Sequence, residues 1–577
     1  MDREPRIGVY ICHCGTNIAA TVDVEAVAEA AARWPGVVVA RHYTYMCSEP
    51  GQKLIKQDSR ELALKRVVVA SCSPRMHEPT FRAAAEEGGV NPYRVEMANI
   101  REQCSWVHSD RAQATRKALD LVASAVAKAA YLEPLQDRYV DVTPGVLVIG
   151  GGVAGLVAAL DVAEAGFPVY VIEQSDHLGG RVAELDCTFP ELEAVEAWLP
   201  TLIERVQSHP NVTVFFNARV TEVKGYVGNF KITVAACRVS GFTSGQLETF
   251  NLKPETLSAG AIIVATGYEL FDPRRKPEFG YGHYPQVITT LDMERRLAAG
   301  ELSVDGRVPQ DIAFIKCVGS RDVQLGHPYC SRVCCAVTAK QAQLVKQRLP
   351  GARVSVFYMD VRTFGKRGEE FYDEARRAGV QYRRGNVSEI RRQNKRLVLR
   401  FEDTFLRRTI EQEADLAVLA VGMEPRQDVA ELASLLKLPR SADGFFLEAH
   451  PKLSPVNTAV EGVFLAGCCQ APKDIPDSVA QAKAAAASAL VLLIRRSVPV
   501  ESATAVVDPQ LCAGCGMCVE VCPYGAPALD PLLGVSVVNA VLCKGCGACA
   551  AACTSKAMRL QHFTPQQVLA QVDALVW

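Results

Sequence analysis

Eight cysteines near the C-terminus form two runs with identical spacing. Each run reads C-x2-C-x2-C-x3-C, from Cys512 to Cys522 and from Cys543 to Cys553. With this spacing three loop thiolates hold one cubane while the fourth cysteine reaches across to a second. Zinc is the alternative, although zinc sites rarely use two interleaved runs of this kind. The expected ligands are Cys512, Cys515, Cys518 and Cys553 for one [4Fe-4S] cluster and Cys543, Cys546, Cys549 and Cys522 for the other.

A further group of four cysteines lies in the middle of the chain and is spaced C-x12-C-x3-C-C. Four thiolates at this spacing suit another iron-sulfur cluster. A disulfide and a plain packing role are the alternatives. Adjacent cysteines close a strained ring when they oxidise, which disfavours the disulfide. The members of this group are Cys317, Cys330, Cys334 and Cys335.

Cysteines also lie just beyond four short apolar runs near the N-terminus. These runs predict strands of a parallel sheet with helices between them, and the carboxyl ends of such strands share one edge where ligands collect. Thiolates from separate strands would then converge on one cluster, although no C-x-x-C is present. The alternative is that these are buried small hydrophobic residues. The cysteines concerned are Cys12, Cys14, Cys47, Cys72 and Cys104.

A glycine fingerprint follows the apolar run 146–149. Gly150, Gly152 and Gly155 give G-x-G-x-x-G where the chain must turn from a strand into a helix. These glycines allow the tight turn, the approach of backbone amides to a pyrophosphate, and close packing of the helix on the strand. Glu173, at the end of the next strand, can accept hydrogen bonds from ribose hydroxyls. The pattern predicts a dinucleotide site, for FAD or NAD.

Other small residues are expected to border the same nucleotide. Gly180 keeps a loop thin beside it, whereas Arg181 is either a nucleotide contact or an ordinary loop residue. Small-residue turns after two later strands would let the chain return beneath the cofactor. The full set expected to bind the cofactor is Gly150, Gly152, Val153, Ala154, Gly155, Glu173, Gly180, Arg181, Thr266, Gly267, Gly467 and Cys468.

A second glycine fingerprint is missing. The second nucleotide domain of a two-dinucleotide flavoprotein would open with another strand and another G-x-G-x-x-G. The corresponding stretch, after Asp311, reads IAFIKCVGSRD and has Cys317 where the glycines should start. The cysteine group therefore stands in place of a pyrophosphate cradle.

The elements that must position these residues predict an α/β, multidomain chain. The repeated alternation of strands and helices indicates parallel sheets. The expected divisions are an N-terminal parallel α/β domain with a cluster (1–135), a two-dinucleotide-type FAD domain in two parts (140–300 and 426–497), a degenerate pyridine-nucleotide-like domain carrying a cysteine cluster (306–425), and an α+β bacterial-type two-cluster ferredoxin domain (500–577).

Composition narrows the class of protein further. The chain has 577 residues, 63 basic and 64 acidic side chains, and a formal net charge of -1, so no strong field recruits nucleic acid or an anionic membrane. We expect a cytoplasmic protein, because the start shows no cleavable leader and Lys483 interrupts the late alanine-rich helix. The 21 cysteines then indicate metal or redox centres rather than disulfides.

The chain resembles the family of A-type subunits of heterodisulfide reductase over nearly its whole length. The stretches that carry the resemblance are CHCGTNIAATVDVE, NIREQCSWVHSD, the glycine fingerprint, KCVGSRD with PYCSRVCC, and GCCQAPKDIPDSVAQ. The family implies a thioredoxin-reductase-like FAD domain, [4Fe-4S] clusters and a role in flavin-based electron bifurcation or confurcation. It also implies a soluble complex with B- and C-type subunits or their equivalents, with ferredoxin and with a hydrogenase- or dehydrogenase-linked input subunit. A homodimer within the complex is a further implication.

The resemblance also implies individual roles. Gly150, Gly152, Gly155 and Glu173 match the FAD fingerprint, and Cys317 with its group matches a cluster that replaces a pyridine-nucleotide site. Lys340 matches a lysine near the flavin ring, where a cation would stabilise a reduced, anionic flavin. The alternative for Lys340 is a solvated helix lysine.

Two departures from the family pattern stand out. Some relatives carry an additional ferredoxin module after the β ribbon. In this chain Cys237 is the only cysteine between Val234 and Ala261, too few for such a module. Cys468 and Cys469 follow GVFLAG where flavoproteins commonly have Asp, so backbone amides would hold the flavin there. The competing functions are a simple NAD(P)H-dependent flavoprotein, like the small subunit of glutamate synthase, and a non-catalytic electron-wire or scaffold subunit.

Overall fold

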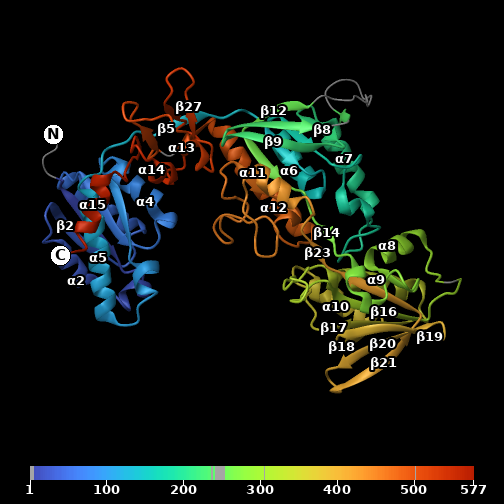
Figure 1. Ribbon diagram of the computed structural model, residues 1–577. Helices are drawn as coiled ribbons and strands as arrows, with labels where there is room; N and C mark the ends of the chain where they lie inside the picture. Colours follow the sequence, from blue (N-terminus) through green and yellow to red (C-terminus); the bar gives the residue numbers. More distant parts are fainter. Residues whose placement is uncertain (1–4, 236–237, 241–253, 305, 501, 577) are drawn as a thin grey trace. The chain divides into compact units, whose positions relative to one another are not determined.

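The computed structural model describes residues 5–235, 238–240, 254–304, 306–500 and 502–576. It separates into two compact units, Met1–Tyr139 with Pro499–Trp577, and Val140–Val498 (Figure 1). Cys237 lies outside the described residues. The domain boundaries expected from the sequence stay predictions.

The first unit begins with a parallel four-stranded sheet in the order β2-β1-β3-β4. Every residue of β1 and β3 is buried, as the apolar runs of a sheet covered on both faces predict. The predicted parallel α/β domain is confirmed, and β4 begins directly after a turn at Pro92–Arg94. The strands are β1 (Ile7–Cys12), β2 (Val37–Tyr43), β3 (Arg66–Ser71) and β4 (Val95–Asn99).

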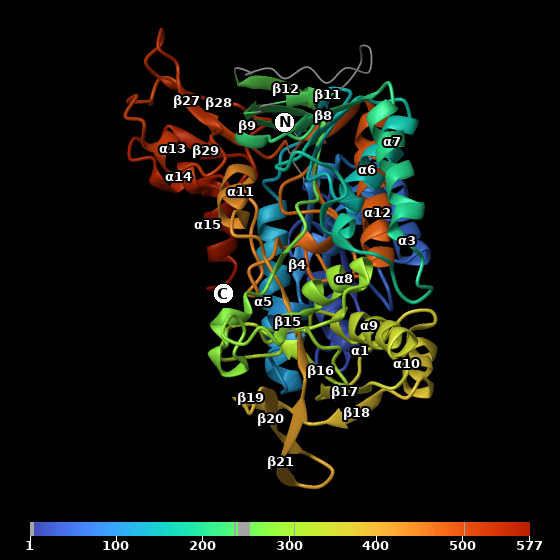
Figure 2. The same cartoon turned by 90° about the vertical axis from the view of Figure 1, so that its right-hand side faces the viewer.

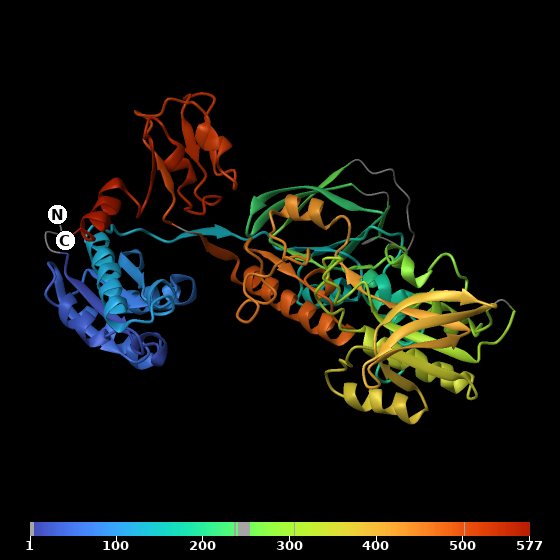
Figure 3. The same ribbon diagram turned by 60° about the horizontal axis from the view of Figure 1, so that its bottom comes forward.

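Helices cover this sheet, and a helix from the far end of the chain joins them. The helices are α1 (Thr16–Ala19), α2 (Val24–Ala31), α3 (Glu49–Glu61), α4 (Pro74–Glu87) and α5 (Arg111–Ala129). The C-terminal helix α15 (Pro565–Asp573) packs against α5, as the red and light-blue helices in Figure 3 show. Gln567 on α15 donates to the Tyr131 carbonyl at 2.9 Å, which links the C-terminal helix to the residues that follow α5.

The ferredoxin-like part of the first unit is small. Two antiparallel pairs of strands accompany two short helices. The elements are β26 (Ala505–Val507) with β29 (Met558–Leu560), β27 (Pro527–Leu529) with β28 (Ser536–Val538), α13 (Met517–Glu520) and α14 (Ala548–Ala552).

The second unit contains two larger sheets, of which the first has six strands in the order β11-β8-β7-β6-β13-β24. Five of them run parallel, and β11 pairs antiparallel with β8. The strands are β6 (Val146–Ile149), β7 (Val169–Ile172), β8 (Val212–Phe216), β11 (Arg238–Ser240), β13 (Ala261–Val264) and β24 (Val463–Leu465). The predicted β ribbon continues as β9 (Arg219–Tyr226), β10 (Asn229–Ala235) and β12 (Glu255–Ala259).

Helices α6 (Val153–Glu164) and α12 (Ile475–Arg495) lie side by side over this sheet, as Figure 2 shows. α12 is long and apolar enough to meet the length and composition criteria for a membrane span, which is weak evidence for one. Its buried alanines belong to the same apolar core as β6 and β13, so it serves here as a core helix. α7 (Leu199–Ser208) and α11 (Val429–Leu436) complete this part.

The second sheet has five parallel strands in the order β15-β22-β16-β17-β18. Its strands are β15 (Val287–Thr289), β16 (Asp311–Val318), β17 (Arg353–Tyr358), β18 (Gln381–Arg384) and β22 (Leu416–Val421), with helices α8 (Thr290–Ala299), α9 (Cys334–Arg348) and α10 (Gly368–Arg377). An antiparallel sheet follows, formed by β19 (Val387–Gln393), β20 (Arg396–Asp403) and β21 (Arg408–Ala414). The short strands β14 (Glu269–Leu270) and β23 (Met423–Glu424) pair between the two larger sheets.

Candidate functional site

The glycine fingerprint forms the turn between β6 and α6. Gly150 has φ of 110°, and a Cβ there would lie 2.4 Å from the Ala265 carbonyl oxygen. A Cβ on Gly155 would lie 1.9 Å from the Gly150 carbonyl oxygen, so only glycine lets α6 approach β6 this closely. At Gly152, which caps α6, the nearest atom to a Cβ is 4.0 Å away. A phosphate can therefore approach the amides at the N-terminus of α6.

A cavity of about 380 Å³ opens at this turn. That volume falls within the range of pockets that enclose cofactors. Gly155 and Gly467 lie outside its lining, and the Gly467 amide instead donates to Gln481 Oε1 at 2.9 Å. The other residues expected to bind the cofactor all line the cavity: Gly150, Gly152, Val153, Ala154, Glu173, Gly180, Arg181, Thr266, Gly267 and Cys468.

Glu173 is held in a fixed orientation at the edge of this cavity. Its Oε2 accepts from the Gly151 amide at 2.7 Å, and its Oε1 accepts from the Ser175 amide and hydroxyl, each at 2.7 Å. Glu173 and Arg426 also line an adjoining cavity of about 130 Å³. The carboxylate therefore lies where the two cavities meet, as an acid that contacts a ribose should.

Lys473 is a cation of the large cavity that the sequence did not predict. Its Nζ donates to Gln470 Oε1 at 2.5 Å and to the Ala471 carbonyl at 3.2 Å, and burial lowers its pKa. Cys468 lies beside it, with Sγ 3.4 Å from the Lys473 carbonyl oxygen, and burial raises the pKa of this thiol. The signal for Lys473 was its place just before a helix within GCCQAPKDIPDSVAQ.

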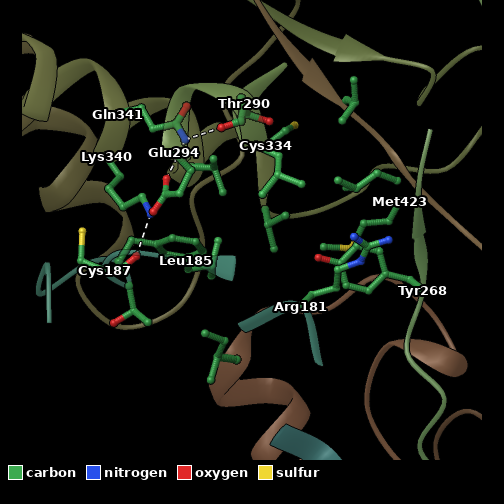
Figure 4. A pocket seen from close by; sticks show the side chains of 18 of the residues that line it. Arg181, Leu185, Cys187, Tyr268, Thr290, Glu294, Cys334, Lys340, Gln341 and Met423 are labelled. Atoms are coloured by element: carbon green, nitrogen blue, oxygen red, sulfur yellow. Dashed lines mark hydrogen bonds and ion pairs between the residues drawn. The ribbon is translucent and has the colours of Figure 1, made fainter. Parts of the chain in front are cut away.

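Lys340 lies at a smaller cavity of about 110 Å³ (Figure 4). Its Nζ donates to Glu294 Oε1 at 2.5 Å and to the Cys187 carbonyl at 2.7 Å. The side chains of Lys340 and Glu294 are each 2% exposed, so the alternative of a solvated lysine is wrong. Gln341 donates to the other Glu294 oxygen at 2.7 Å.

This smaller cavity borders the large one. Both are lined by Arg181, Tyr268 and Met423. No local signal in the sequence marks Glu294, because it lies on α8 while its partner Lys340 lies on α9. The position of Lys340 beside a flavin ring stays a prediction.

The Cys317 group is built from a bulge and a helix start. The register of β16 shifts between Ile315 and Val318, and Cys317 within this bulge has φ of 60°. A bulge of this kind re-aims a side chain at the end of a strand. Cys334 and Cys335 begin α9, where the helix dipole favours negative charge. The same strand-turn-helix position in the other sheet holds the glycine cradle.

The Cys334 thiol contacts the thiols of Cys317 and Cys335. A hydrogen bond from the Cys334 thiol lowers the pKa of Cys317 and lowers that of Cys335 to about 5, where the nearby Lys316 also contributes. These contacts and burial raise the pKa of Cys334 itself. The arrangement supplies soft thiolate ligands, the donors that iron-sulfur clusters and zinc use.

Cys330 is placed differently from the other three. Its Sγ accepts from the Arg332 amide at 3.4 Å. Within the described residues, it is not part of the buried cluster that Cys334 and Cys335 form with Ala420. Its role as a fourth ligand stays a prediction.

The C-terminal cysteines line two cavities in the sets that their spacing predicts. Backbone amides point at several of the sulfurs, such as that of Ser536 at 3.3 Å from Cys512 Sγ and that of Ala505 at 3.4 Å from Cys543 Sγ. Each set of thiols surrounds a space, and a cubane would lie there between its ligands. One cavity is lined by Cys512, Cys515, Cys518 and Cys553, and the other by Cys522, Cys543, Cys546 and Cys549.

At the N-terminal sheet the predicted convergence is partial. Charge interactions link Cys14 with the thiols of Cys12, Cys47 and Cys72, and Arg101 donates to Cys14 Sγ at 3.4 Å. Burial raises the pKa values of Cys12, Cys47 and Cys72, to about 11 for Cys72.

Cys104 is separate from these thiols. It lies in a π-helical turn (Arg101–Ser105) after β4 and points back toward α5, with Sγ 3.0 Å from the Ala114 carbonyl oxygen. We expected all five thiols to lie together at the carboxyl ends of the strands. This π-helical turn, which the sequence did not predict, directs Cys104 away from the others. Cys104 therefore packs in the core between the sheet and α5.

Comparison with known proteins places the whole chain. Residues 144–489 match the pyridine nucleotide-disulphide oxidoreductase family, and residues 504–554 match the 4Fe-4S dicluster domain. The second A-type iron-sulfur subunit of the CoB--CoM heterodisulfide reductase of Methanopyrus kandleri is 46% identical, over 91% of this chain and 91% of its own. The chain belongs to the family of A-type subunits of heterodisulfide reductase.

Other A-type subunits match over similar lengths. That of the H(2):CoB-CoM heterodisulfide,ferredoxin reductase of Methanothermobacter marburgensis is 44% identical over 99% of this chain and 97% of its own. Among solved structures, T. acidophilum thioredoxin reductase aligns at 18% identity with a TM-score of 0.41, over 61% of this chain and 100% of its own. By its family, this A-type subunit is an oxidoreductase with an FAD-type redox region and a 4Fe-4S dicluster region.

Proposed function

We propose that this chain is the flavin-bearing electron-transfer subunit of a cytoplasmic heterodisulfide-reductase-like complex. Within it, flavin-based bifurcation or confurcation links a two-electron donor to ferredoxin-type acceptors and to acceptors on the other subunits. The observation that carries the proposal is the Cys317 bulge followed by the paired cysteines of α9, at the position where a pyridine-nucleotide domain would have its second glycine cradle.

The six-stranded sheet of the second unit supplies the site for FAD, which exchanges both one and two electrons when bound. The turn at Gly150 and Gly152 and the amides at the start of α6 would hold the pyrophosphate. Glu173 would accept hydrogen bonds from the ribose hydroxyls, because its carboxylate is already oriented by the Gly151 and Ser175 amides. The cavity volume and the open N-terminus of α6 both fit this group.

Two lysines are candidates for the cation at the flavin ring. Lys340 borders the smaller cavity, but Glu294 neutralises its charge. Lys473 lines the large cavity and its Nζ bonds only neutral oxygens among its hydrogen-bond acceptors in the described chain. A positive charge at the ring favours the reduced, anionic cofactor. We therefore expect Lys473→Met to lower the flavin midpoint potential more than Lys340→Met, as measured by optical redox titration.

The cysteine sets supply the sites for single-electron carriers. We propose [4Fe-4S] clusters on the two C-terminal sets and on Cys317, Cys330, Cys334 and Cys335. The lowered pKa values of Cys317 and Cys335 fit this chemistry, because thiolates rather than thiols bind metal. A further cluster is proposed on the N-terminal cysteines Cys12, Cys14, Cys47 and Cys72, without Cys104.

Paired variants test the N-terminal cluster. Cys72→Ala should reduce the iron content by about four atoms per chain, whereas Cys104→Ala should leave it unchanged because Cys104 packs in the core. Equal iron contents in the two variants would contradict the N-terminal cluster.

The partners are proposed from relatives. Names of relatives couple a heterodisulfide with H2, formate, F420H2 or ferredoxin. We propose B- and C-type subunits or their equivalents, ferredoxin and an electron-input subunit as partners of this chain, with a homodimer within the complex.

Anaerobic purification with flavin and iron counts tests the proposal against its competitors. We expect one FAD and about twelve or more iron atoms per chain, from three or four clusters. NADH alone should not bleach the flavin, because no second glycine cradle is present in the described second sheet. Absence of flavin would favour a scaffold subunit, and direct bleaching by NADH would favour a simple dehydrogenase.

A further inference from the structure

Three lysines are buried in the described part of the chain, and their partners differ. Lys128 is paired with Glu96 at 2.9 Å, and Lys340 is paired with Glu294 at 2.5 Å. Lys316, 6% exposed, instead donates to Cys335 Sγ at 3.1 Å and to the Asp360 carbonyl at 3.3 Å. A buried ammonium is costly unless an anion faces it, so the sulfur of Cys335 takes the place of a carboxylate.

Further cationic groups surround the same sulfurs. Arg321 contacts Cys317 and also binds the Asp360 carboxylate, which Arg362 shares at 3.3 Å. The Arg362 amide points at Cys335 Sγ at 3.4 Å. The Asp360 carboxylate thus pairs with the guanidinium groups of Arg321 and Arg362. The Lys316 ammonium has the sulfur of Cys335 as its counter-charge.

The fold holds the side chain of Lys316 in place. It precedes Cys317 at the end of β16, where the bulge begins, and its ammonium lies over the Tyr358 ring of β17 at 5.2 Å. Its side chain is buried, and Nζ reaches Cys335 in the first turn of α9.

We infer that Lys316 sets the redox potential of the cluster on Cys317, Cys330, Cys334 and Cys335, by placing a fixed positive charge against a ligand sulfur. This inference rests on the proposed function, because it requires that cluster. On reduction the cluster gains one electron and no bond forms or breaks, so an adjacent cation favours the reduced form. Net charge and hydrogen bonds to the sulfurs are among the factors that set cluster potentials.

The C-terminal sets provide the contrast within the same chain. There backbone amides donate to the sulfurs of Cys512 and Cys553, and the Cys518 thiol itself donates to the Ser536 hydroxyl. Lys316 therefore acts on the Cys317 cluster alone. It raises the reduction potential of this cluster above the value that the four thiolate ligands alone would give.

The test is an EPR-monitored reductive titration of the full chain, purified without oxygen. Cys334→Ser first identifies the midpoint that belongs to this cluster, because that signal should disappear. Lys316→Met should then lower this midpoint by about 59 mV or more, a tenfold change in the one-electron equilibrium, and leave the other midpoints in place. Lys316→Arg keeps the charge and should restore the midpoint toward the wild-type value.

Lys346→Met is the matched control. Lys346 lies on α9 too, but its Nζ bonds the Pro350 and Ala352 carbonyls instead of a sulfur. It should leave every midpoint unchanged. An unmoved midpoint in Lys316→Met, or an equal shift in Lys316→Arg, would overturn the inference while leaving the cluster itself in place.

Iron content separates the remaining outcomes. If Lys316→Met and Lys316→Gln both lose about four iron atoms while Lys316→Arg retains them, the lysine is needed for assembly and the tuning role is overturned. If Cys334→Ser removes neither iron nor a signal, the proposed cluster fails, and the inference fails with it.

Discussion

Two cysteine-rich regions, the ferredoxin-like part and the five-stranded sheet that carries Cys317, differ in how their cysteines relate to the apolar core. In the ferredoxin-like part the buried apolar cluster has seven residues, Ala505, Cys518, Ala526, Cys543, Cys549, Met558 and Leu560, of which three are cysteines. The five-stranded sheet that carries Cys317 has two larger buried clusters, and neither contains a cysteine. In the ferredoxin-like part the proposed ligands form a large share of the apolar core. In the five-stranded sheet they lie outside the two large apolar clusters.

This difference separates two uses of a cluster. A small fold without enough apolar surface depends on a metal centre to be stable, and metal binding is then part of its folding free energy. A fold with its own core can gain a cluster at the end of a strand without depending on it. The position of Cys317 in a β-bulge, where a nucleotide cradle would otherwise lie, is of the second kind.

Removal of iron should show the largest contrast between the regions. After anaerobic chelation, amides of β26–β29 should exchange more than a thousand-fold faster, a loss of about 4 kcal/mol of protection. Amides of β16, β17 and β22 should keep most of theirs. Hydrogen exchange with mass spectrometry measures both, and equal loss in the two regions would contradict the comparison.

Substitution of a single proposed ligand in each region tests the same difference in stability. Cys549→Ser should abolish the unfolding transition of the ferredoxin-like part, whereas Cys334→Ser should leave the unfolding of the five-stranded sheet within about 1–2 kcal/mol of wild type. Calorimetry of anaerobic protein follows both transitions. Cys187→Ser, a buried cysteine outside every proposed cluster, controls for loss of a thiol as such.

Polar contacts, by contrast, should matter to the second region more than its iron does. Glu294→Gln leaves the Lys340 ammonium buried without an anion, which costs about 3–5 kcal/mol. Iron content should not change. Glu191→Gln, which breaks an exposed pair with Arg367, should cost at most about 1 kcal/mol. Denaturant unfolding of both variants compares them, and a similar cost would show that burial of the Glu294 pair is unimportant.

The smallest expected effect concerns the loop between Cys317 and Cys330. Asp322 accepts from Lys276 at 2.7 Å, and this hydrogen bond lowers its pKa. Because the folded pKa is depressed, the stabilisation is present above the pKa of an unfolded aspartate and is lost as pH falls through the folded value, below about pH 4.

Asp322→Asn should therefore destabilise the unit by up to about 1 kcal/mol at pH 7, and by less at pH 3. Urea unfolding at the two pH values measures the difference. A difference between variant and wild type that is the same at both pH values would indicate that the ion pair contributes nothing.

Local patterns predicted those parts of the site that depend on neighbours in sequence. The glycines between β6 and α6 and the two C-terminal cysteine runs have fixed spacings, and their sets assemble as expected. The Lys340–Glu294 pair could not be predicted, because it joins α8 to α9 through packing alone. The position of Cys104 could not be predicted for a similar reason, since a single π-helical turn directs its side chain toward α5.

Backbone geometry explains the rest of the difference. The left-handed φ of Cys317 and the register shift beside it carry no composition signal, yet they decide where the thiol points. Lys316 is adjacent to Cys317 in sequence, but its contact with Cys335 depends on the crossing of β16 beneath α9.

The iron-to-flavin ratio of Cys334→Ser against wild type tests the central claim most directly. In protein purified without oxygen, the account predicts a loss of about four iron atoms per FAD, an unchanged flavin content and an intact fold of the five-stranded sheet. An unchanged ratio, or flavin bleaching by NADH alone, would contradict a cluster at the place of the second nucleotide cradle.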